Sequence, residues 1–168
     1  MNPDLLIAHE LVYEKCGHKF TTPLKESESD EYSACSFNLN GLAIKFRSAK
    51  ITPTKIGQFV TLWKRKGDGP IRPFDASDPI DLFIVSVRKG KRLGQFIFPK
   101  AVLADQGIVS TKKRDGKRAM RVYPLWDITT SKQAQKTQAW QLKYFLEIPL
   151  KKSVDLVLAK KLLNNPDN

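Results

Sequence analysis

The stretch Leu42–Lys66, LAIKFRSAKITPTKIGQFVTLWKRK, sets the expectations for the rest of the chain. It carries seven Lys or Arg residues and no Asp or Glu, which predicts a strongly positive surface. Its first part alternates apolar and polar residues, as a half-buried strand does. Thr52-Pro53 then has the pattern of a helix cap followed by the first helical position. Apolar residues recur at helical spacing up to Trp63, so we expect a helix with a buried stripe that includes Trp63 and ends at Lys64, Arg65 and Lys66.

An antiparallel hairpin is predicted just before this helix. Apolar residues alternate with polar ones over residues 35–39 and again over residues 42–46. Asn40-Gly41 between them supplies the positive φ angles of a two-residue hairpin turn. With the apolar side chains directed into the core, Lys45 and Arg47 are expected on the opposite, outward face.

The remaining segments predict an α/β (α+β) protein with a mixed sheet flanked by helices. Strands are expected at 82–87, 94–98, 108–110 and 120–123, the first two joined by the turn RKGKR. Helices are expected at 2–16, 99–106, 131–145 and 153–163, with Asn2, Ser131 and Ser153 as caps.

Composition favours one domain, residues 1–168, with an anionic partner. The net charge is +12, and residues 41–125 hold nineteen basic against six acidic residues. The two cysteines form no disulfide framework, and neither a signal peptide nor a membrane-spanning run is evident. We therefore expect a cytoplasmic protein that binds no membrane, and the sequence leaves its oligomeric state open.

Three basic sets, at 45–66, 88–92 and 112–121, predict a phosphate-binding surface, although each could also be a solvated turn or helix end. The helix at 131–145 adds amides that suit base edges, and its alternative is a surface helix with one aromatic residue anchored in the core. Lys64 and Arg65 would line the same groove. The residues predicted to bind nucleic acid are Lys45, Arg47, Lys50, Lys55, Lys100, Arg121, Tyr123, Gln138, Trp140 and Gln141.

Catalytic motifs are weak. A metal-dependent nuclease needs two or three carboxylates around its ions, and no pair among the candidates has a diagnostic spacing. Those candidates are Glu10, Glu14, Glu31, Asp75, Asp78 and Asp81. His9, Cys16, His18 and Cys35 do not have the spacing of a zinc site, and Cys35 is expected in the core. We predict no metal and no cofactor, with Mg²⁺ required only if the protein is a nuclease.

Four segments resemble the MepB family of small bacterial proteins, over about residues 31–145. They are FRSAKITPTKIGQFVTLWKR at 46–65, GQFIFPK at 94–100, RVYPLWD at 121–127 and KTQAWQLKYF at 136–145. The resemblance implies a fold related to restriction-endonuclease-like, or PD-(D/E)XK-like, nucleases.

In that fold the catalytic set is an Asp followed by an (Asp/Glu)-x-Lys triplet. Asp81, Gln95 and Lys100 are the matching residues if the protein is a nuclease. Ile97 stands where the triplet has lysine, and the strand that should carry metal ligands holds the cations Arg47 and Lys50. This departure favours a scaffold that binds phosphate directly.

The sequence therefore predicts a nucleic-acid-binding protein that contacts the phosphate backbone through a basic groove without cutting it. DNA is favoured over RNA as the partner. A divalent-metal-dependent nuclease and an adaptor that binds an acidic protein are the alternatives, and a phosphorylated small ligand is a further one. Enzyme activity is left uncertain and is the less favoured outcome.

Overall fold

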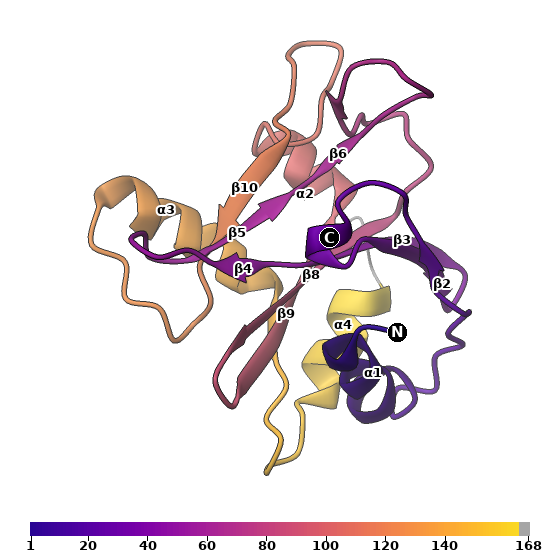
Figure 1. Cartoon of the computed structure of the whole chain (residues 1–168). Coiled ribbons are helices and arrows are strands. Elements are labelled where there is room, and N and C mark those ends of the chain that lie inside the picture. Colours follow the sequence, from indigo (N-terminus) through magenta and orange to yellow (C-terminus); the bar gives the residue numbers. More distant parts are fainter. Residues whose placement is uncertain (165–168) are drawn as a thin grey trace.

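A six-stranded mixed sheet runs through the centre of the protein, seen in a computed structural model that describes residues 1–164 (Figure 1). Its strand order is β1-β2-β3-β8-β9-β11, and the one parallel pairing joins β3 to β8. The strands are β1 (Leu24–Lys25), β2 (Cys35–Leu39), β3 (Leu42–Ser48), β8 (Leu82–Lys89), β9 (Arg92–Pro99) and β11 (Phe145–Glu147).

Two smaller sheets lie beside the central one. The first has the order β10-β5-β4, and the second pairs β6 with β7. Their strands are β4 (Lys50–Ile51), β5 (Gln58–Thr61), β6 (Trp63–Lys64), β7 (Arg72–Pro73) and β10 (Ala119–Val122).

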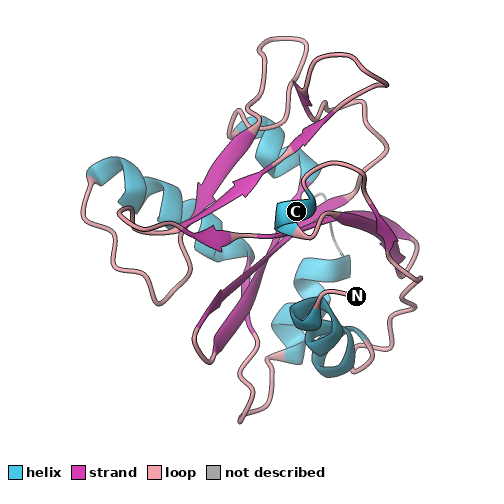
Figure 2. Ribbon diagram, viewed as in Figure 1, coloured by secondary structure: helices cyan, strands magenta, loops and turns pink. Residues whose placement is uncertain are grey.

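The central sheet is covered on both faces, which gives two hydrophobic clusters (Figure 2). Helix α1 (Pro3–Ala8), its π-helical continuation (His9–Tyr13) and helix α4 (Leu156–Asn164) pack on one face. The small β10-β5-β4 sheet, helix α2 (Lys100–Asp105) and the end of helix α3 (Lys132–Gln141), which continues as a 3₁₀ turn (Leu142–Tyr144), pack on the other. The predicted fold class, a mixed sheet flanked by helices, is confirmed.

Most predicted local signals are also confirmed. Asn40 and Gly41 both have positive φ and join β2 to β3 as the hairpin turn. The side chain of Asn2 accepts hydrogen bonds from the first turn of α1, and Ser131 caps α3 by accepting from the amide of Ala134. The RKGKR turn joins β8 to β9.

The predicted helix at 52–66 is wrong, because this segment forms β5 and β6 after a turn. Gly57 has a φ of +84°, outside the helical region, and a side chain there would overlap the Tyr123 ring. From Gln58 onward every second side chain is buried, the period of a strand. Valine and threonine in this run also prefer strands. As a result, Trp63 is half-buried in β6 rather than part of a buried stripe.

Two smaller predictions also differ from the structure. Residues 108–110 form no strand, only an isolated bridge between Ser110 and Asp75. The last helix begins at Leu156 rather than Ser153, and the carboxylate of Asp155 accepts a hydrogen bond from the amide of Leu158. Within residues 1–164 no helix is both long and apolar enough to span a membrane.

Gly94 is required where β11 pairs with β9. A methyl group at this position would overlap the Phe145 ring and lie 3.0 Å from the carbonyl oxygen of Leu146. We expect Gly94→Ala to lower the free energy of unfolding by about 1–3 kcal/mol, and Gly94→Val to lower it further. Urea denaturation measures both. Unchanged or higher stability for Gly94→Ala would contradict this packing, because restriction of the unfolded chain alone would stabilise that variant.

Candidate functional site

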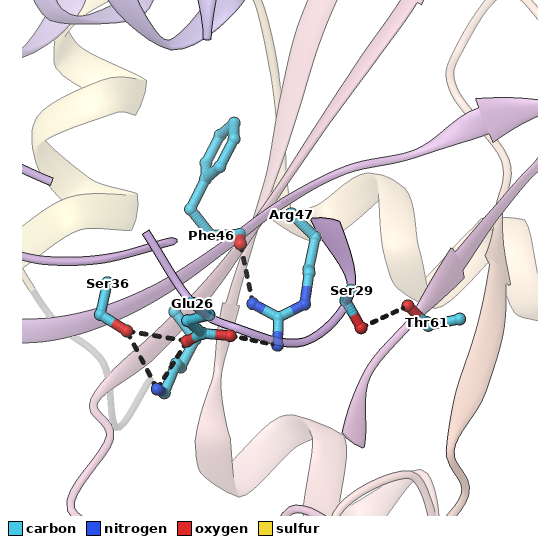
Figure 3. Close-up of polar contacts among 7 residues, drawn as sticks. Glu26, Ser29, Ser36, Phe46, Arg47 and Thr61 are labelled. Atoms are coloured by element: carbon cyan, nitrogen blue, oxygen red, sulfur yellow. Dashed lines mark hydrogen bonds and ion pairs between the residues drawn. The ribbon is translucent and has the colours of Figure 1, made fainter. Parts of the chain in front are cut away.

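Arg47 is fully buried, which corrects the prediction that it lies on the surface. Its Nη2 lies 2.8 Å from Oε2 of Glu26, and its Nη1 donates to the carbonyl oxygen of Phe46 at 2.9 Å (Figure 3). The other carboxylate oxygen of Glu26 accepts from Lys45 Nζ at 2.6 Å and from the Ser36 hydroxyl at 2.8 Å. Glu26 therefore pairs with both cations that strand alternation directed away from the α1 and α4 core.

Burial and charge act in opposite directions on this pair. Burial alone would raise the pKa of Glu26, but Arg47 and Lys45 outweigh it and hold the pKa below its ordinary value. Burial lowers the pKa of the Arg47 guanidinium, while Glu26 opposes that shift. Among residues 1–164 the buried Nε of Arg47 has no hydrogen-bond acceptor. Removal of Glu26 would therefore leave a buried, incompletely solvated charge.

Glu26 begins an acidic segment, residues 26–33, that lies across β3 and β5. Glu28 lies 3.2 Å from Nε of Arg65, and Glu31 lies 3.9 Å from Nζ of Lys50. The Thr61 hydroxyl of β5 donates to the Ser29 hydroxyl at 2.9 Å (Figure 3). The segment therefore contacts cations on three different parts of the chain.

The outer face of the small sheet carries a row of cations around an aromatic ring. Lys50 and Arg121 are both cross-strand partners of Phe59, so the three side chains share one face. The guanidinium carbon of Arg121 lies 5.9 Å from the centre of the Phe59 ring. Tyr32 of the acidic segment meets Phe59 edge-on at 6.2 Å, and Lys50 Nζ lies 5.2 Å from the Tyr32 ring centre. We define this outer face as Lys50, Phe59, Thr61, Ala119 and Arg121.

A groove of about 330 Å³ separates β10 from α3 and continues the outer face at Arg121. None of the described residues that line it carries a carboxylate. It brings together four residues predicted from sequence, Arg121, Tyr123, Trp140 and Gln141. Sequence reasoning missed Lys117, Gln133 and Thr137, which also line it, although Lys117 belongs to the basic set at 112–121.

The two predicted glutamines hold the groove together rather than present free amides. Gln141 is buried, accepts from the Tyr123 amide at 2.9 Å and donates to the Arg121 carbonyl at 2.9 Å. Gln138 donates to the backbone carbonyls of residues 123, 124 and 127. Trp140 packs against Phe98 of the core. The alternative of a surface helix anchored by one aromatic residue therefore describes most of α3.

Three further predicted cations lie elsewhere. Lys64 pairs with Asp78 at 2.6 Å, and Lys100 Nζ donates to the carbonyl oxygen of the same Asp78 at 2.7 Å. Lys55 is exposed on the loop between β4 and β5, in the lining of a different pocket that also contains Trp126. Of the predicted cations, only Lys50 and Arg121 lie on the outer face, while Lys45, Arg47 and Arg65 pair with the acidic segment.

The residues of the nuclease alternative are not assembled into a metal site. Asp81 accepts a hydrogen bond from the Ala43 amide at 2.8 Å, and the Lys100 amide donates to the Asp81 carbonyl. Gln95 is fully buried and accepts from the Tyr13 hydroxyl on the α1 face of the sheet. Across residues 1–164 no three His, Cys, Asp or Glu side chains gather as metal ligands would. Cys35 is a core thiol, as predicted, and burial raises its pKa to about 11.

Comparison with known proteins identifies relatives of this fold. The model of the MepB-like family matches residues 26–147. The protein in the crystal structure of MepB is 31% identical in sequence to this chain, with a TM-score of 0.76. The match covers 91% of this chain and 100% of the MepB chain. A bacterial homing endonuclease is 16% identical, and the match covers 77% of this chain and 81% of that one. Its TM-score of 0.44 supports no conclusion about function. No curated protein matches the chain significantly.

Glu26 should carry a large share of the stability of this region. We expect Glu26→Gln to lower the free energy of unfolding by about 3 kcal/mol, because Arg47 would stay buried without a counter-charge. The exposed ion pair between Glu31 and Lys50 provides the control, since Glu31→Gln should lower the free energy of unfolding by less than about 1 kcal/mol. Equal losses in urea denaturation would contradict the assignment.

The same pair predicts a pH dependence. The folded-state pKa of Glu26 lies below its unfolded value of about 4.5, so its contribution is present above that pH. The contribution is lost as the pH falls through the lower folded-state pKa. Glu26→Gln should therefore show a weaker loss of stability between neutral pH and pH 3 than the unmodified protein in thermal unfolding. If the stability of Glu26→Gln and that of the unmodified protein fell in parallel with pH, this role of Glu26 would be contradicted.

Proposed function

The chain belongs to the MepB-like family, and from that premise we propose that it binds nucleic acid through the outer face and the β10–α3 groove without cutting it. The observation that carries the proposal is the groove itself. Its described lining contains Lys117 and Arg121, hydroxyl and amide side chains, and no carboxylate. Phosphate oxygens are acceptors that such a lining suits, whereas a divalent cation finds no charged ligand there.

Aromatic rings beside these cations support a polynucleotide rather than an isolated phosphate. Phe59 lies between Lys50 and Arg121, and Tyr123 lines the groove next to Arg121. Base stacking on such rings tolerates any sequence and adds to backbone contacts. We propose DNA as the partner, bound through its backbone, with the protein in the cytoplasm, where thiols such as Cys35 stay reduced.

An acidic protein surface is the second candidate partner, because the same cations would pair with its carboxylates. Nucleic acid differs from an acidic protein in carrying bases, and only bases would stack on the rings of Phe59 and Tyr123. A pull-down that survives nuclease treatment would favour the adaptor. One that nuclease abolishes supports nucleic-acid binding.

Salt dependence tests the proposal. If about six phosphates are neutralised, the plot of log affinity against log salt should have a slope near −5 for duplex DNA, or near −4 for a single strand. The triple variant Lys50→Gln, Lys117→Gln, Arg121→Gln should make this slope shallower by about 2 to 3, because three phosphate contacts are removed. Fluorescence anisotropy with a labelled oligonucleotide measures both slopes.

A matched control removes the same charge from the other side of the molecule. Lys15→Gln, Lys19→Gln and Lys161→Gln, on the α1 and α4 side, should leave the slope almost unchanged. Equal effects of the two triple variants would show that net charge alone drives binding. A slope near zero for the unmodified protein would reject nucleic-acid binding.

Absence of cutting is tested separately. Plasmid DNA incubated with the protein and Mg²⁺ or Mn²⁺ should stay intact, because Gln95 is buried against Tyr13 and Lys100 Nζ is bound to the carbonyl oxygen of Asp78. Gel electrophoresis over a time course measures this, with Asp81→Ala as the matched variant. Cleavage by the unmodified protein that Asp81→Ala lacks would establish the nuclease alternative instead.

A further inference from the structure

We propose that the acidic segment, residues 26–33, is an internal mimic of nucleic acid that occupies part of the binding surface, and that its part from Glu28 to Tyr32 is displaced when DNA binds. This inference rests on the proposed function and concerns the cations that the segment covers. The set consists of Lys45, Lys50 and Arg65, with Arg47 beneath them. All four were predicted from sequence to line the nucleic-acid-binding groove, and each of the four meets a carboxylate of this segment.

The contacts of the segment match the two chemical parts of a polynucleotide. Its carboxylates at Glu26, Glu28 and Glu31 take the place of phosphates against basic side chains. The Tyr32 ring takes the place of a base, because it meets Phe59 edge-on at 6.2 Å and lies beneath the Lys50 ammonium.

Backbone geometry is an independent sign that these contacts hold the segment in place. Among residues 1–164 only three non-glycine residues have positive φ, and two of them are Ser29 and Ser33. They flank the 3₁₀ turn Asp30–Tyr32, with φ angles of 56° and 51°. Serine has no particular preference for the left-handed region, so both residues are strained there. Displacement of the segment would release this strain, which makes the covered state easier to open.

The ion pairs differ in how easily they can exchange. Glu26 side-chain exposure is 18%, against 40% for Glu28 and 79% for Glu31. Exposed pairs contribute little to stability and are screened by salt, so an incoming phosphate can replace them. Glu26 with Arg47 stays as the anchor, and the part from Glu28 to Tyr32 is the part that moves aside.

Neutralisation of the exchangeable carboxylates tests the proposal. The double variant Glu28→Gln, Glu31→Gln should bind a labelled oligonucleotide about tenfold more tightly at low salt, because Lys50 and Arg65 no longer have an internal competitor. Its salt slope should stay close to that of the unmodified protein, because displacement brings the same cations into contact with phosphate in both complexes. Glu10→Gln, Glu14→Gln is the matched control, with the same change in net charge on the α1 side. It should change affinity by less than about twofold.

The possible results distinguish the internal mimic from the proposed nucleic-acid binding itself. Tighter binding with a similar salt slope for Glu28→Gln, Glu31→Gln alone supports the mimic. Equal affinities for the two double variants, or weaker binding by Glu28→Gln, Glu31→Gln, would overturn it while leaving nucleic-acid binding intact. Failure of the unmodified protein and all variants to bind would overturn the proposed function and the mimic together. Thermal unfolding confirms that the variants compared are folded.

Discussion

The buried ion pair between Arg47 and Glu26 is the constraint on which the rest of this surface depends. A guanidinium with no exposed area needs a carboxylate beside it, and Glu26 is the one that reaches it. This contact fixes the start of the acidic segment over β3. The segment then crosses to β5, where Ser29 and Tyr32 meet Thr61 and Phe59. One buried pair therefore determines which cations of the small sheet are covered and which are open.

Much of the fold could be predicted because its signals are local. The Asn40-Gly41 turn, the alternation on both sides of it and the Asn2 cap depend on neighbouring residues alone. The helix predicted at 52–66 failed because its apolar spacing also fits a strand over the few residues involved. Gly57 and the β-branched Val60 and Thr61 favour a strand, whereas the prediction rested on the Thr52-Pro53 pair and the apolar spacing.

The site was harder to predict, because the number of charged residues in a sequence does not show which cations form ion pairs with which carboxylates. Strand alternation gave the correct direction for Arg47, away from the α1 and α4 core, but not the segment that covers it. Gln138 and Gln141 were predicted to present free amides to nucleic acid, yet their amides are bonded to backbone around residue 123. Such pairings join residues far apart in the chain, so only the tertiary structure identifies the open cations beside β10 and α3.

Amide chemical-shift mapping tests the account most directly. A ¹⁵N-labelled sample titrated with a short DNA oligonucleotide at low salt would locate the contacts residue by residue. The account predicts shifts over 58–61, 119–123 and 131–137, together with changes over 28–33 as the acidic segment leaves β5. Shifts confined to α1 and α4, with residues 28–33 and 119–123 unaffected, would contradict it.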